Sequence, residues 1–212
     1  MMPEETIEGF RLSTDQEHVF SLLANDRPYL GAVAIQLEGP LDKAVLRRAL
    51  AKLIERNEIL RTTFYLKSDV PLQVVVNANG EVPLTEEDLT QVESARQNDV
   101  IAARFAEFQN SDLDLARFPV WRASLLQLTA ERHVLILAAS ALCVDNFTLR
   151  NIQNELQRFY AEELQGSEAS DEQVQYADFS AWQHDLLESE EAEQPRSFWD
   201  RRRAAAVHPN RK

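Results

Sequence analysis

The chain has 212 residues, of which 44% are apolar, and this composition predicts a folded globule and excludes a largely disordered protein. Its net charge of -13 would repel a phosphate backbone or an anionic membrane surface, so we expect neither nucleic acid nor a membrane as a partner. A single cysteine excludes an internal disulfide, and four scattered histidines without paired cysteines predict no metal site.

The N-terminal residues show no basic segment followed by an apolar run, which is the pattern of a secretory signal. No stretch approaches the roughly 20 apolar residues that span a bilayer. We therefore expect a cytoplasmic location.

The first forty residues predict a β-α-β unit. Phe10 and Leu12 indicate a short extended entry, residues 15–23 a helix, and residues 29–37 a strand that ends at Gly39-Pro40.

The next element is an amphipathic helix that begins after Asp42, a good N-cap residue. Its apolar residues recur on one stripe, while Lys43, Arg47, Arg48 and Lys52 face water. The stripe consists of Val45, Leu46, Ala49, Leu50, Leu53 and Ile54.

Two β-type runs follow, at 60–66 and 72–76, and predict a hairpin in which Pro71 indicates an edge position. The polar, acidic stretch 77–90 shows no sustained period, so we interpret it as a surface loop. A helix is expected over residues 92–108.

A second hairpin is predicted from runs at 120–128 and 133–139, and the latter is apolar throughout, as in a buried central strand. Directly afterwards the period changes to that of a helix, with one face marked by a set of apolar residues. This set is Leu149, Ile152, Leu156, Phe159 and Tyr160. Residues 140–146 therefore form a corner between a strand and a helix.

The remaining chain predicts an internal linker at 166–171, terminal helices with Trp182 and Trp199, and a flexible tail at 204–212. We expect the tryptophans, Trp121 included, to be packing residues. The whole pattern predicts one α/β domain over residues 1–212, an α+β sandwich with a mixed β-sheet flanked by helices.

Four stretches occur in the order of known core motifs. They are Leu12 to Phe20, Arg56-Asn57-Glu58-Ile59-Leu60-Arg61-Thr62-Thr63-Phe64, Leu113-Asp114-Leu115 with Pro119 and Arg122, and Tyr176-Ala177-Asp178-Phe179 with Trp182-Gln183. With these motifs the chain resembles the N-terminal lobe of a condensation domain from a nonribosomal peptide synthetase, a relative of chloramphenicol acetyltransferase. The resemblance implies that fold, and a second lobe of comparable size.

The resemblance also locates the reaction centre at the corner. The family places two histidines, three variable residues, an aspartate and a glycine there. This chain has Ser140 and Ala141 at the histidine positions, Asp145 at the aspartate and Asn146 at the glycine. Ala141 replaces the histidine to which the family's catalysis is assigned, so the motif is degenerate and no catalytic residue is implied.

Two interpretations of Asp145 stay open. In the family the matching aspartate forms a structural pair with the arginine of the second motif, Arg61 here; alternatively, Asp145 favours the start of the next helix. We expect Cys143 to be a small buried apolar residue, and His18, His133 and His184 to be core or surface residues.

Three functions fit the sequence. The first is a non-catalytic lobe that binds a peptidyl or acyl carrier protein, or a neighbouring synthetase domain. The second is part of an active amide-forming condensation domain that is completed by a C-terminal lobe. The third is a free-standing protein that binds a small ligand.

The resemblance implies no directly bound cofactor, only phosphopantetheine presented by a carrier protein. A lobe without its partner lobe should expose an apolar face, so we also expect self-association or binding of a complementary C-terminal lobe.

Overall fold

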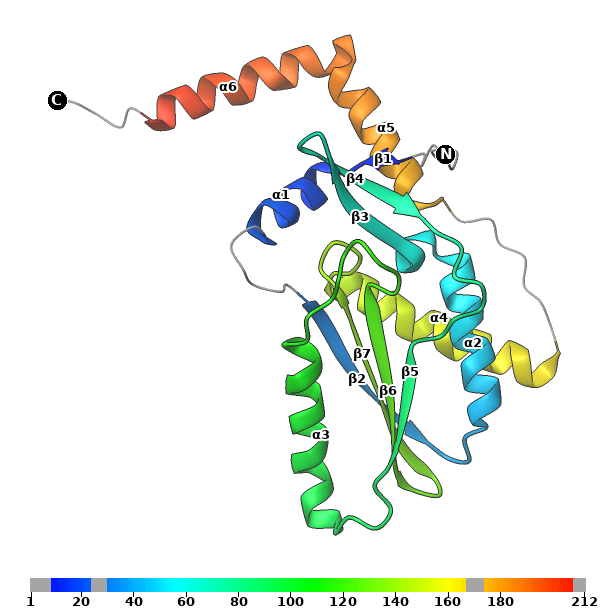
Figure 1. The fold of residues 1–212 in the computed structure, drawn as a ribbon. Helices are drawn as coiled ribbons and strands as arrows, with labels where there is room; N and C mark the ends of the chain where they lie inside the picture. The colour runs from blue at the N-terminus through cyan, green and yellow to red at the C-terminus, as the bar shows by residue number, and fades with distance from the viewer. Residues whose placement is uncertain (1–8, 24–29, 167–173, 208–212) are drawn as a thin grey trace, which may run out of the picture.

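The computed structural model describes residues 9–23, 30–166 and 174–207 and contains two β-sheets with flanking helices (Figure 1). The larger sheet has the strand order β2-β7-β6-β5 and the smaller β1-β4-β3. The larger sheet consists of β2 (Leu30–Glu38), β7 (Arg132–Ser140), β6 (Trp121–Thr129) and β5 (Leu84–Asp88); the smaller consists of β1 (Phe10–Arg11), β4 (Val70–Val75) and β3 (Thr62–Lys67).

Helices cover both faces of the larger sheet. Apolar residues of α2 and α4 form the main core with one face, and residues of α3 form a smaller cluster with the other. The α-helices are α1 (Thr14–Leu23), α2 (Lys43–Arg56), α3 (Ser94–Gln109), α4 (Asn146–Gln165), α5 (Tyr176–Glu188) and α6 (Glu193–Val207); two 3₁₀ turns are η1 (Glu58–Arg61) and η2 (Glu190–Ala192). The predicted fold class, a mixed β-sheet flanked by helices, is confirmed.

Helix α2 matches the sequence prediction residue by residue. Its buried side chains are Val45, Leu46, Ala49, Leu50, Leu53 and Ile54, the predicted stripe. The Asp42 carboxylate accepts hydrogen bonds from the backbone N–H groups of Ala44 and Val45, at 2.9 and 3.1 Å. Such a cap satisfies donors that the first helical turn leaves without partners.

Both predicted hairpins are present. Strand β7 lies between β2 and β6 and is antiparallel to both, with Ser140 opposite Leu30 and Ala139 opposite Trp121. In the smaller sheet β4 pairs with β3 along its length, but β1 pairs only with Leu72 and Gln73. Pro71 lies opposite Leu66 of β3 and is not paired with β1. Proline lacks an N–H donor, and such a position at the edge of a sheet tolerates it.

The interpretation of residues 77–90 as a loop is wrong in part, because residues 84–88 form β5. This strand pairs in parallel with β6, with Leu84 opposite Ala123. Its sequence, Leu-Thr-Glu-Glu-Asp, has low β-propensity. Tertiary charge partners outweigh that propensity: Glu86 lies 2.7 Å from Arg47, and Glu87 lies 2.8 Å from Arg104.

The C-terminal part differs from the prediction in two ways. Helix α6 includes residues 204–207, for which the sequence predicts a flexible tail, and 208–212 lie outside the described residues. Trp182 and Trp199 are 57% and 60% exposed, so only Trp121 is the packing residue we expected. Helix α4 ends at Gly166 in the left-handed conformation, while 167–171 of the predicted linker are not described.

Candidate functional site

The corner that follows β7 is held by Ser140. Its N–H donates to the carbonyl oxygen of Val120 at 3.1 Å, and its own carbonyl accepts from the N–H groups of Cys143 and Val144 at 2.8 and 3.1 Å. Its hydroxyl oxygen accepts from the Leu142 N–H at 3.2 Å. Ser140 is buried and serves the turn, so its hydroxyl is not an available nucleophile.

The side chains of residues 141–144 supply no base. Ala141 is half-buried and carries only a methyl group. Cys143 is buried, and burial raises the pKa of its thiol far above the ordinary value. The thiol therefore stays protonated at neutral pH, and Cys143 is the small apolar residue that the sequence predicts.

Asp145 caps helix α4. Its carboxylate accepts hydrogen bonds from the backbone N–H and the hydroxyl of Thr148, both at 2.7 Å. The backbone hydrogen bond from Thr148 is the main cause that lowers the pKa of Asp145. This arrangement corresponds to the second interpretation of Asp145, a residue that starts the helix.

The predicted pair of Arg61 with Asp145 is wrong. The Arg61 guanidinium donates to the carbonyl oxygen of Val76 at 3.0 Å and to the Glu58 carboxylate at 3.2 Å. Glu58 lies three residues before Arg61 on the same turn, η1. Arg61 reaches this carboxylate and the Val76 carbonyl oxygen where it stands, and neither hydrogen bond involves α4. The Arg61 Nε atom is buried and has no hydrogen-bond partner in the described part of the chain.

The first motif reaches the corner through Gln16. Ser13 and Gln16 form a capping box at the start of α1: the Gln16 N–H donates to the Ser13 hydroxyl at 3.2 Å, and the Ser13 N–H donates to the Gln16 side-chain oxygen at 3.0 Å. The Gln16 amide nitrogen then donates to the Leu142 carbonyl oxygen at 3.0 Å. All these atoms are buried, so Gln16 fixes the backbone of the corner.

The fourth motif, on α5, holds the other side of the same segment. The hydroxyl groups of Tyr176 and Ser13 lie 2.8 Å apart, and buried His184 lies 2.6 Å from the Leu12 carbonyl oxygen. Burial is the main cause that raises the pKa of Tyr176, and nearby Asp15 and Asp145 add to it, so the phenol stays protonated.

Sequence reasoning did not single out Gln16 or Tyr176 individually. Both lie within quoted motifs, and that was the available signal. Of the histidines, His133 and His184 are buried and His18 is exposed, in agreement with their predicted core or surface positions.

No cluster of three or more histidine, cysteine, aspartate or glutamate side chains within 9–23, 30–166 and 174–207 could hold a metal ion. In the same part of the chain, every helix is too short or too polar to cross a bilayer.

Comparisons with known proteins agree with the motif order. Residues 10–210 match the family model of the condensation domain. Chondramide synthase cmdD of Chondromyces crocatus is 30% identical over 179 residues, which cover 84% of this chain and 4% of that protein.

Two solved structures show the same fold. The first condensation domain of the calcium-dependent antibiotic synthetase superposes with a TM-score of 0.78 at 21% identity, covering 91% of this chain and 46% of that one. The X-domain in its complex with OxyB from teicoplanin biosynthesis gives a TM-score of 0.71 at 28% identity, covering 92% and 41%. The chain thus spans less than half of each solved chain, and it belongs to the condensation-domain family of nonribosomal peptide synthetases.

Proposed function

We propose that this chain is a degenerate condensation-domain lobe that binds a carrier protein or a neighbouring synthetase domain and does not catalyse amide formation. The observation that carries the proposal is the chemistry of the corner. Ala141 has no titratable group, the Ser140 hydroxyl is used by the turn, and the Cys143 thiol is buried and protonated.

The missing histidine matters because an attacking amine must lose a proton as the amide bond forms. An imidazole, with an ordinary pKa near 6.5, can accept that proton, and such general-base help is typically worth about 10²–10⁴-fold in rate. A methyl group gives none of it. The hydrogen bonds of Gln16 and Asp145 hold the backbone of the corner in place. The corner therefore keeps its scaffold but lacks a histidine base.

A solved relative supports an interaction role. The X-domain, 28% identical to this chain, was solved in complex with another protein, OxyB. We transfer to this chain only the principle that a condensation-type domain can serve as a docking surface. The expected ligand is a carrier protein that presents its phosphopantetheine arm, with no cofactor held directly by the lobe.

The decisive experiment measures binding and transfer separately. Holo carrier proteins and synthetase domains are titrated against the chain by isothermal calorimetry, and amide formation is followed by mass spectrometry. We expect binding without transfer. Amide formation far above the uncatalysed rate would overturn the proposal.

Ala141→His, compared with Ala141→Gln as a control of similar length without a base, asks whether the base is the missing part. With a C-terminal lobe present, we expect transfer from Ala141→His only.

An alternative function is favoured by one observation. Because the chain spans 46% of a solved condensation domain, a second lobe could complete an active enzyme in which precise placement of the two substrates replaces the base. That function predicts amide formation by the Ala141 protein once the second lobe is added. Equal rates for Ala141 and Ala141→His would support it.

We also propose that the α5–α6 region takes part in self-association or binds a complementary C-terminal lobe. It exposes a set of large apolar side chains, and α6 projects away from both sheets (Figure 1). The set consists of Phe179, Trp182, Leu186, Leu187, Phe198 and Trp199. Light scattering after size exclusion should show a mass above 24.2 kDa that rises with concentration, and a monomer at all concentrations would count against self-association.

A further inference from the structure

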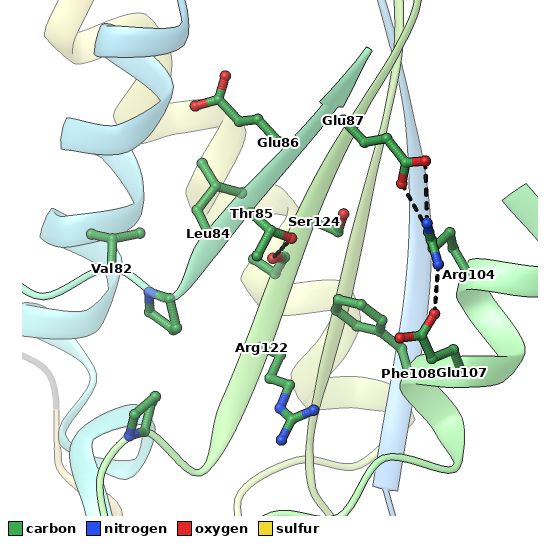
Figure 2. A pocket seen from close by; sticks show the side chains of 13 residues that line it. Val82, Leu84, Thr85, Glu86, Glu87, Arg104, Glu107, Phe108, Arg122 and Ser124 are labelled. Carbon is green, nitrogen blue, oxygen red and sulfur yellow. Dashed lines mark hydrogen bonds and ion pairs between the residues drawn. The ribbon is translucent and has the colours of Figure 1, made fainter. Parts of the chain in front are cut away.

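A pocket of about 730 Å³ lies between α3 and the β5 side of the larger sheet, and no residue of the corner at 140–146 lines it, although Pro119 and Arg122 of the third motif do (Figure 2). Helix α3 packs against β2, β7 and β6, and it is the only described helix on that face. The fourth strand is therefore left partly uncovered. The volume falls in the range of about 300–1,000 Å³ that is usual for small-molecule sites.

One hydroxyl that lines the pocket makes no hydrogen bond within the described part of the chain. Ser124, on β6, is only 4% exposed and lines the pocket, and its Oγ makes no hydrogen bond to any described residue. The neighbouring hydroxyl of Thr85 differs, because it donates to the Ala123 carbonyl oxygen at 3.2 Å. The Ser124 Oγ atom is not among the buried atoms without a partner, so it is accessible from the pocket and can form a hydrogen bond with a polar ligand atom.

The two arginines of the pocket differ in the same way. Arg104 donates to both carboxylate oxygens of Glu87, at 2.8 and 3.2 Å, and to Glu107 at 2.8 Å, so its charge is already neutralised. Arg122 makes one hydrogen bond, to the carbonyl oxygen of Asp112 at 2.7 Å, and has no carboxylate partner in the part of the chain that the structure describes. Arg122 thus offers a positive charge and unused donors at the rim.

The other walls decide which anion fits. Phe108, Pro83 and Pro119 line the same pocket as Ser124 and Arg122 and give it apolar surface. Glu87 and Glu107 lie on the α3 side, and the chain as a whole carries a charge of -13, so a dianion such as phosphate would be repelled. A carboxylate brings one negative charge and matches the planar donors of a guanidinium.

We propose that this pocket binds a small monocarboxylate with an apolar body, its carboxylate on Arg122, a polar atom at Ser124 Oγ, and its apolar part against Phe108 and the two prolines. The proposal is independent of carrier-protein binding, because it uses none of the residues at the corner. Failure of either proposal leaves the other intact.

The test is an NMR titration of the 212-residue chain with 3-phenylpropanoate and octanoate, with 3-phenylpropanamide and inorganic phosphate as controls. We expect the carboxylates to shift amide signals of β5, β6 and the C-terminal half of α3. Because a charge-assisted hydrogen bond is worth about 1.5–3 kcal/mol, Arg122→Gln should weaken carboxylate binding about tenfold or more. Ser124→Ala should weaken it about fivefold.

Arg96→Gln is the matched control, since Arg96 lies on the N-terminal part of α3 and its side chain is 78% exposed. It should bind the carboxylates as the unchanged protein does, and circular dichroism melting would establish that all three variants fold. Equal affinity for the amide and the carboxylate, shifts confined to α5 and α6, or unchanged binding by Arg122→Gln would each overturn the proposal.

Discussion

The two faces of the larger sheet are covered differently. Helices α2 and α4 close one face, where Leu50 and Phe159 have no exposed surface. Of the described helices, α3 alone covers the other face, and its apolar side chains, Ile101 and Phe105 among them, are half-buried. One helix buries the central strands β6 and β7 on this face, where Leu126 and Ile136 have no exposed surface, but leaves the edge strand β5 partly uncovered. The closed face is therefore covered by two helices, and the open face has a pocket beside β5.

The largest expected effect is the loss of unfolding free energy when a core side chain is shortened, and it should differ between the two faces. Leu50→Ala removes a fully buried side chain from α2 and should lower the free energy of unfolding by about 2–5 kcal/mol. Ile101→Ala on α3 should cost about 1–2 kcal/mol, because a half-buried side chain loses less burial. Urea unfolding of both variants checks this, and equal costs would show that the α3 face is as well packed as the other.

The same difference explains how far sequence reasoning reached. The 3.6-residue stripe of α2 and the apolar run of β7 predicted their elements because burial on a closed face imposes a period on the sequence. The corner at 140–146 was located for the same reason, since a strand pattern ends and a helix pattern begins there. Asp42 and Asp145 both cap the helices that follow them.

The sequence does not predict β5, because an edge strand that helices only partly cover has few positions that must be apolar. Only Leu84 of its five residues is buried, and its acidic residues are held by arginines from α2 and α3 that are distant in sequence. The Arg61–Asp145 pair failed for a related reason. The motif indicated which residues are retained, but not that Glu58 and Thr148 would be nearer partners.

At the end of β7, Gln16 provides the next largest effect. Gln16→Ala leaves the Leu142 carbonyl oxygen and the Ser13 N–H without their buried partner, which should cost about 1–3 kcal/mol. Amide hydrogen exchange at Cys143 and Val144 should also become faster. Gln183→Ala is the control, because Gln183 accepts from Thr14 at an exposed site and its loss should cost less. Unchanged exchange in Gln16→Ala would mean that the turn holds itself.

Asp145 should have a smaller effect, typical of an N-cap. Asp145→Ala should lower the free energy of unfolding by about 0.5–2 kcal/mol. Its pKa is lowered in the folded state, so this stabilisation is present above the carboxyl's ordinary pKa and is lost as the pH falls through the folded value. A double-mutant cycle with Arg61→Met should give a coupling energy near zero. Strong coupling would restore the pair that the structure does not show.

The smallest effects are those of one ion pair on each face. Glu162 and Lys52, 2.8 Å apart on the closed side, have side chains 10% and 19% exposed, whereas Arg104 and Glu87 on the open side are 42% and 34% exposed. Hydrogen bonds from Lys52 and Arg104 lower the pKa of Glu162 and of Glu87 respectively, so both pairs stabilise the fold above the ordinary carboxyl pKa and lose that contribution in acid.

Salt should distinguish the two pairs, because ions screen exposed charges more than buried ones. The loss of stability in Glu87→Gln should disappear in about 1 M sodium chloride, where the screening length is about 3 Å, and the loss in Glu162→Gln should persist. Urea unfolding of both variants at low and high salt measures this. If the two variants respond alike, the charges on the open face are screened no more than those on the closed face. The guanidinium of Arg122, which has no carboxylate partner among the described residues, would then be no better exposed to salt than the ammonium group of Lys52 on the closed side.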